Sequence, residues 1–193
     1  MKYYIDITLL PNEEANLGFL WEKVYQQVHL ALVEGKNSDR TSEVAVSFPE
    51  YGHKHFPLGA KLRLIAGTET KLQQLDIGKW LNRLTDYTHF TSIKTVPSSV
   101  NQFAYFKRKQ LDTNVERMAR RRVKRKGETI EQAMDHLSGF IDKESNLPSI
   151  NTKSLSENKT FKLFIEKVVV EQPKTGLFTC YGLSQQQVTV PWF

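Results

Sequence analysis

Two hydrophobic periodicities alternate along the first 97 residues, and they constrain the fold more than any other feature of the chain. Residues 2–9 (KYYIDITL) carry apolar side chains at every second position, which is typical of a strand. Residues 13–34 carry them at the i, i+3, i+4 and i+7 positions of an amphipathic helix. The same criteria predict strands at 43–48, 61–66 and 87–96, and a second helix at 69–84 that is interrupted at Gly78.

The resulting order, β-α-β-β-α-β, is the ferredoxin-like pattern. We therefore expect an α+β protein whose N-terminal domain, residues 1–97, has a ferredoxin-like fold. Many RNA-binding domains share this pattern, but a fold alone does not assign a function. The RNA-recognition version stacks bases on aromatic residues of its sheet, and the stretch 61–67 (KLRLIAG) has none. Base stacking on this sheet is not expected.

The composition changes after Pro97, and we expect a second α+β half at residues 98–193 that binds RNA. A strand is predicted at 103–111, followed by a helix over 114–126. Thr113 or Asn114 can cap this helix at its start, and a glycine at position 127 can end it.

The last third of the chain predicts one more helix and several antiparallel strands. The helix is expected at 129–137, and a polar loop follows between Ser145 and Asn158. The chain then predicts strands at 160–170, 177–182 and 188–193.

One segment holds all of the excess positive charge. The 193 residues include 27 Lys and Arg against 21 Asp and Glu, a formal net charge of +6. Residues 107–126 contain ten basic and two acidic residues, so the remainder of the chain is slightly acidic. A helix face that is merely solvated usually carries both positive and negative side chains, whereas here positive side chains are neighbours and repel one another. A site that binds a polyanion therefore explains this segment better than solvation alone. The cations share one face within about 100° of arc, and they are Arg117, Arg120, Arg121 and Lys124, with Arg125 at the edge.

The composition also excludes several classes of protein. With 39% hydrophobic and 11% aromatic residues the chain can bury a core, so disorder is not expected. It has neither an apolar run near the roughly 20 residues of a membrane span nor a signal peptide, which favours a cytoplasmic protein without a membrane partner. The single Cys180 cannot form an internal disulfide and is expected to be a small buried hydrophobe. No Cys/His spacing resembles a zinc site, so we expect neither metal nor cofactor.

Several motifs together resemble one family, in order and over nearly the whole chain. The first helix contains VHLALV at 28–33, and Arg108 and Gln110 precede an NxERxxRR run at 114–121. The C-terminal part contains FKLFI at 161–165, GLFTCYGLS at 176–184 and VPWF at 190–193. These residues resemble the subtype I-F CRISPR repeat-processing endoribonucleases.

The resemblance implies an enzyme that cuts precursor CRISPR RNA at the 3′ base of the repeat hairpin without metal. The 2′-hydroxyl beside the scissile phosphate would attack, leaving a 2′,3′-cyclic phosphate and a 5′-hydroxyl. The protein would then stay on the hairpin of the guide RNA, as a monomer on its RNA. It would be a subunit of the prokaryotic, cytoplasmic interference complex and contact other subunits, especially the backbone subunit.

Two alternatives remain open at this stage. One is a subunit of the same kind of complex that binds the hairpin without cutting it. The other is an unrelated basic RNA-binding protein of ferredoxin-like fold, and the C-terminal motifs argue against it.

The resemblance also implies the catalytic residues. His29 matches the family's catalytic histidine, and an imidazole with an ordinary pKa near 6.5 suits the removal of a 2′-hydroxyl proton. Ser154 matches the active-site serine by its spacing of seven residues to a stacking phenylalanine, although Ser149 and Ser156 are close enough to exchange with it. Tyr181 matches a tyrosine that orients the histidine.

The remaining implied residues bind RNA. Arg108 and Gln110 match residues that read bases near the bottom of the stem, where a guanidinium or amide fork fits a purine edge. Phe161 matches the platform under the closing base pair. The expected RNA-binding set is Arg108, Gln110, Arg117, Arg120, Arg121, Lys124, Arg125, Ser156 and Phe161.

Overall fold

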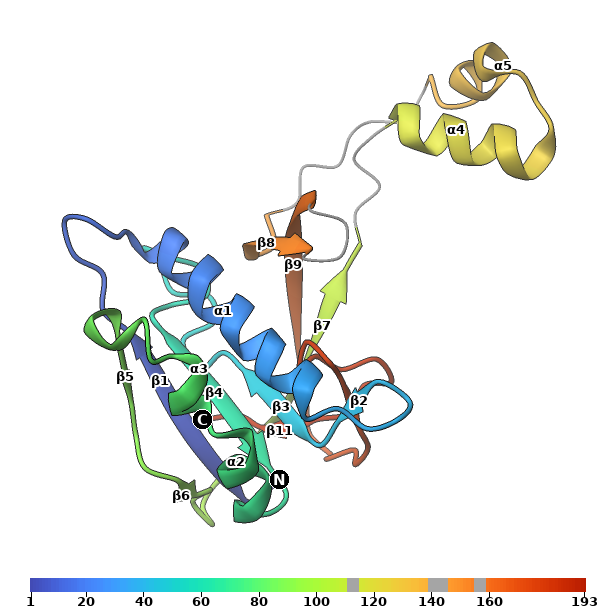
Figure 1. Ribbon diagram of the computed structural model, residues 1–193. Coiled ribbons are helices and arrows are strands. Elements are labelled where there is room, and N and C mark those ends of the chain that lie inside the picture. Colours follow the sequence, from blue (N-terminus) through green and yellow to red (C-terminus); the bar gives the residue numbers. More distant parts are fainter. Residues whose placement is uncertain (111–114, 139–145, 155–158) are drawn as a thin grey trace. The chain divides into compact units, whose positions relative to one another are not determined.

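The computed structural model describes residues 1–110, 115–138, 146–154 and 159–193, and it is a mixed α+β protein with antiparallel sheets (Figure 1). Contacts divide it into two compact units, residues 1–109 with 148–193 and residues 110–147. In this division the later strands belong to the same unit as the first 97 residues. The expected domains, residues 1–97 and 98–193, stay a prediction.

The first sheet contains the four strands predicted in the N-terminal part. Its order is β3-β4-β1-β5, and the short β6 also pairs with β1, all antiparallel. The single strand expected at 87–96 is interrupted at residues 91–93, where the amide of Thr91 donates to the carbonyl of Asp6 and its hydroxyl accepts the amide of Asp6. The bounds are β1 Tyr3–Leu9, β3 Val44–Ser47, β4 Lys61–Ala66, β5 Thr88–Phe90 and β6 Lys94–Thr95.

Three helices lie together on one face of this sheet (Figure 1). They are α1 (Leu17–Glu34), α2 (Glu69–Leu75) and α3 (Ile77–Trp80), and a 3₁₀ turn η1 (Thr85–Tyr87) follows. The apolar stripe of α1 is buried from Leu20 to Leu32, as its periodicity predicts, and Leu17 at its start is half-buried. The break in the second predicted helix falls at Asp76, whose backbone is left-handed with φ 43°, and not at Gly78. Within the described residues, no helix combines the length and apolar character needed to cross a membrane.

A second sheet is built from the later strands in the order β11-β7-β9-β8. The polar loop expected between Ser145 and Asn158 is wrong in part, because Ser149–Ser154 form β8, paired with β9 and packed on α1. The strands expected at 177–182 and 188–193 are only two residues long, and β10 pairs with β2. The bounds are β2 Thr41–Ser42, β7 Phe103–Lys109, β8 Ser149–Ser154, β9 Lys159–Val170, β10 Phe178–Thr179 and β11 Val190–Pro191.

The second unit is a helical hairpin of α4 (Val115–Lys126) and α5 (Ile130–Asp135). The predicted basic helix is confirmed, and Gly127, with φ +70°, ends it in the left-handed conformation that glycine adopts without strain. The expected caps Thr113 and Asn114 lie outside the described residues. Ala119 is fully buried, which explains an apolar position within the basic helix.

A buried ion pair joins the C-terminus to the first sheet. Arg63 on β4 donates to both carboxylate oxygens of Asp6 on β1, at 2.6 and 2.9 Å, and to the backbone carbonyl of Phe193 at 2.8 Å. Its guanidinium lies over the rings of Tyr4 and Phe193, 4.5 and 3.9 Å from their centroids. Each guanidinium nitrogen of this buried arginine therefore donates a hydrogen bond, either to Asp6 on β1 or to the last residue of the chain.

Replacing Asp6 by Ala should lower the free energy of unfolding by about 3–5 kcal/mol, because a buried guanidinium would lose its counter-charge. Urea denaturation measures the change. The matched control is Glu43→Ala, which removes an exposed ion pair with Lys71 (2.9 Å) and should cost at most about 1 kcal/mol. Similar losses for the two variants would contradict this account.

Candidate active site

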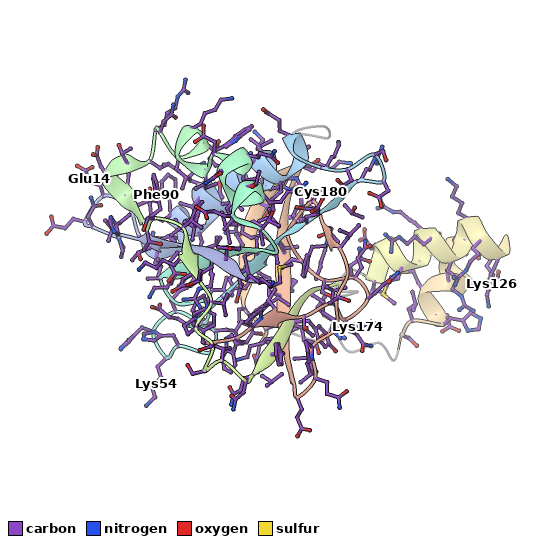
Figure 2. The ribbon with its side chains drawn as sticks, turned by 90° about the horizontal axis from the view of Figure 1, so that it is seen from below. Glu14, Lys54, Phe90, Lys126, Lys174 and Cys180 are labelled. Atoms are coloured by element: carbon purple, nitrogen blue, oxygen red, sulfur yellow. The ribbon has the colours of Figure 1, made fainter. Side chains whose placement is uncertain are left out.

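His29 points its ring at a backbone carbonyl from the other end of the chain. The half-buried imidazole lies on α1, and its Nδ1 is 2.8 Å from the carbonyl oxygen of Cys180, a residue labelled in Figure 2. A carbonyl oxygen can only accept, so Nδ1 must carry the proton of this bond. In the neutral ring Nε2 is then unprotonated, and it can accept a proton from a ligand.

Tyr181 covers one face of the same imidazole. The two rings are parallel within 6°, with centroids 4.0 Å apart. Burial lowers the pKa of His29 below its ordinary value, and the hydrogen bond to Cys180 opposes this shift in part. The neutral form, with its free Nε2, is therefore favoured at neutral pH.

The turn that supplies this carbonyl is held by its own hydrogen bonds. Thr179 accepts the amide of Gly182 at its carbonyl (2.8 Å) and the amides of Tyr181 and Leu183 at its hydroxyl (3.2 and 3.3 Å). Gly182 has φ +70° and fits closely against β3, where the amide of Val46 donates to its carbonyl at 2.9 Å. We call residues 179–183 the active-site turn.

Tyr25 anchors the active-site turn from the same helix that carries the histidine. It lies one helical turn before His29, is almost fully buried, and its hydroxyl donates to the carbonyl of Tyr181 at 2.9 Å. Burial raises the pKa of Tyr25, so its hydroxyl remains a donor. Tyr25 and His29, four residues apart on α1, thus bind the consecutive carbonyls of Tyr181 and Cys180.

A second cluster adjoins Tyr181. The guanidinium of Arg108, on β7, lies 5.1 Å from the ring centroid of Phe161, on the neighbouring strand β9. Burial raises the pKa of Tyr181, and the positive charge of Arg108 opposes this shift, so the arginine is also close to the tyrosine. The structure therefore brings together four residues expected at the site, namely His29, Tyr181, Arg108 and Phe161.

Ser154 ends β8, directly opposite Lys159 in the register with β9. Alternation places it on the same face of β8 as the buried Ile150 and Thr152, whereas Ser149 lies on the other face. The helix that carries the histidine packs against β8. This placement favours Ser154 over Ser149, and Ser156 lies outside the described residues.

The expected cationic stripe lies on α4 in the second unit. The side chains of Arg120, Arg121, Lys124 and Arg125 are exposed, and Arg120 pairs with Glu116 at 3.1 Å. Gln110 is exposed at the start of this unit, and the side chain of Arg117 is not described.

Two features of the site had no signal of their own in the sequence. Tyr25 lies in the buried stripe of α1, where an aromatic residue predicts packing alone. Backbone carbonyls carry no sequence pattern, so the bond from His29 to Cys180 could not be anticipated. The expectation that Cys180 is buried is wrong, because it is half-buried and its thiol donates to the carbonyl of Arg40 at 3.4 Å.

The described residues contain no group of three or more His, Cys, Asp or Glu side chains that could hold a metal ion. The described part of the site brings together an imidazole, aromatic faces and a guanidinium.

Comparison with known proteins identifies the family. The model for "CRISPR-associated protein (Cas_Csy4)" matches residues 4–193. The chain belongs to the Cas6/Csy4 family of CRISPR-associated endonucleases. The family expected from the motifs is thus confirmed.

Two relatives in the Cas6/Csy4 family match along their whole length and the whole of this chain. The CRISPR-associated endonuclease Cas6/Csy4 of Escherichia coli (strain UTI89 / UPEC) is 34% identical over 194 residues. The protein of the same name from Pseudomonas aeruginosa (strain UCBPP-PA14) is 32% identical over 197 residues.

In this Cas6/Csy4 chain, Gly182→Ala should lower the free energy of unfolding by about 2–5 kcal/mol, from left-handed strain and overpacking. The added Cβ would contact the Val46 side chain and lie 2.9 Å from its backbone nitrogen. The control is Gly52→Ala, at φ +94° in open space, which should cost only about 1–2 kcal/mol. Denaturant unfolding measures both, and equal costs would show that the turn is not closely packed.

Proposed function

We propose that this chain is a metal-independent endoribonuclease that recognises the CRISPR repeat hairpin and cuts precursor CRISPR RNA at the 3′ base of the stem. The observation that carries the proposal is the bond from His29 Nδ1 to the Cys180 carbonyl, at 2.8 Å. It leaves Nε2 as the atom that can take a proton, and the stacked Tyr181 keeps the ring in one orientation.

RNA supplies its own nucleophile, so the enzyme needs to provide only alignment and a base. His29 Nε2 takes the proton of the 2′-hydroxyl as that oxygen bonds to the adjacent phosphorus. The bond from phosphorus to the 5′ oxygen breaks, this oxygen takes a proton from solvent water and leaves as a 5′-hydroxyl, and His29 returns its proton to water. The upstream product ends in a 2′,3′-cyclic phosphate. Ser154, on the face of β8 toward α1, holds the ribose or the 2′-hydroxyl by a hydrogen bond.

The RNA stem is held by two groups of residues. Phe161 stacks under the closing base pair, a contact worth about 1–3 kcal/mol by analogy with single-strand stacking. Arg108, already beside that ring, and Gln110 read bases near the bottom of the stem. The cations of α4 bind phosphates and guanine edges of the stem. They are Arg117, Arg120, Arg121, Lys124 and Arg125. Ser156 completes the RNA-binding set.

We further propose that the product hairpin stays bound and that the protein serves as a subunit of the interference complex, next to its backbone subunit, in the prokaryotic cytoplasm. The relatives' shared name, CRISPR-associated endonuclease, supports a role in this system. The strand order β3-β4-β1-β5 supports a ferredoxin-like arrangement of the first sheet.

A cleavage assay in EDTA tests the proposed function. The substrates are a repeat hairpin and the same RNA with a 2′-deoxy substitution beside the scissile phosphate. The native RNA should be cut, and the deoxy RNA should bind equally well and stay intact. His29→Ala should lower the cleavage rate by about 10²–10⁴-fold without changing affinity, because only the base is lost.

The matched control is His89→Ala, an exposed histidine on β5 that should leave the rate unchanged. Binding without cleavage by the wild-type chain would instead indicate the non-catalytic hairpin-binding subunit. A parallel loss of affinity in His29→Ala would assign His29 a structural role.

A further inference from the structure

Arg40 lies beside the candidate active site, and the functions assigned above do not use it. Its carbonyl accepts the thiol of Cys180 at 3.4 Å, while the carbonyl of Cys180 accepts His29 Nδ1. The next residue, Thr41, is paired with Thr179 at the start of the active-site turn. A single residue, Cys180, therefore separates the backbone of Arg40 from the imidazole.

The backbone of Arg40 is held in an unfavourable conformation. Its φ is +63°, which costs a residue with a Cβ about 1–2 kcal/mol. The loop is fixed around it, since its amide donates to Asn37 (3.0 Å) and Asp39 accepts the amide and hydroxyl of Thr41 (3.1 and 2.6 Å). Such strain is concentrated at functional sites, where the surrounding structure maintains it.

The guanidinium of Arg40 is available to an external anion. The side chain is exposed, and no described residue forms an ion pair with it. The two nearest carboxylates in the sequence are engaged elsewhere, because Asp39 binds Thr41 and Glu43 pairs with Lys71 at 2.9 Å. An unpaired arginine on a fixed backbone favours phosphate, which its planar fork can bind with two hydrogen bonds.

The position of Arg40 indicates which phosphate it binds. The cation already assigned to the stem, Arg108, lies at the Tyr181 and Phe161 side of the turn. Arg40 instead adjoins Cys180, and an RNA chain that crosses the imidazole must continue past the scissile phosphate in the 3′ direction. We propose that Arg40 binds a backbone phosphate of the single-stranded RNA immediately 3′ of the cut, an inference that rests on the proposed function.

This contact would exist in the precursor and be lost in the product, because cleavage removes the RNA on the 3′ side. Arg40 would thus add affinity for uncut RNA alone. Phosphate contacts carry no base information, so the effect should not depend on the sequence of the 3′ flank.

The test measures the affinity of the wild type and of the variant Arg40→Asn for two RNAs. Asparagine tolerates the left-handed backbone and removes the charge. One RNA is an uncleavable 2′-deoxy hairpin with a 3′ extension, and the other ends at the cut. Arg40→Asn should weaken binding of the extended RNA on the order of threefold to tenfold and reduce its log–log salt slope by about 0.7, leaving the product hairpin unchanged. Arg40→Gly, which also suits a positive φ, should give the same result if the first variant unfolds.

The matched control is Arg83→Asn, which replaces an exposed arginine between α3 and η1. It should change the affinity for neither the extended RNA nor the product hairpin. Equal binding of the extended RNA by wild type and Arg40→Asn, or equal losses for both RNAs, would overturn the inference. Cleavage of the unmodified hairpin by the wild type, measured in parallel, tests the proposed function separately, because the binding comparison uses an RNA that cannot be cut.

Discussion

The hydrogen bond between His29 Nδ1 and the Cys180 carbonyl is the constraint on which the rest of the site depends. It joins residues 151 positions apart, so it forms only when α1 and the C-terminal chain are both in place. The fold provides this by burying α1 on the first sheet and docking the active-site turn on β3 and on Tyr25. The buried Arg63, bonded to Asp6 and to the last residue, fixes the chain beyond the turn to the same sheet. A base with one defined free nitrogen is therefore a product of long-range packing.

Much of the fold could be predicted from periodicity, because its strands and long helices bury one face each. Strand β4 has the predicted bounds, and α1 and α4 match within a few residues. The predicted elements that differ from the structure do so for physical reasons. Strand β8 (SINTKS) has a single apolar residue, Ile150, and its burial comes from pairing with β9, which no local pattern reveals. The second helix breaks at Asp76 because an aspartate can also adopt the left-handed conformation that glycine is expected to supply.

The site was predictable where a side chain belongs to a recognisable motif and unpredictable where backbone groups act. His29, Tyr181, Arg108 and Phe161 were expected from the resemblance, and the structure brings them together. The roles of Tyr25, Gly182 and Arg40 depend on carbonyls, a positive φ and a loop next to the turn, which leave no spacing in the sequence. Charge patterning predicted the cationic helix α4 as the RNA-binding element, whereas the candidate base is a neutral group in the other unit.

The protonation state of the His29 ring nitrogens decides whether this residue can act as the base. Nitrogen-15 NMR of the protein during a pH titration reports which nitrogen carries the proton in the neutral ring, and at which pH the second proton binds. We expect a protonated Nδ1, a bare Nε2 and a pKa of His29 below the ordinary value of about 6.5, because the ring is half-buried. A neutral ring with its proton on Nε2 would contradict the account, since the nitrogen assigned as the base would then have no free lone pair.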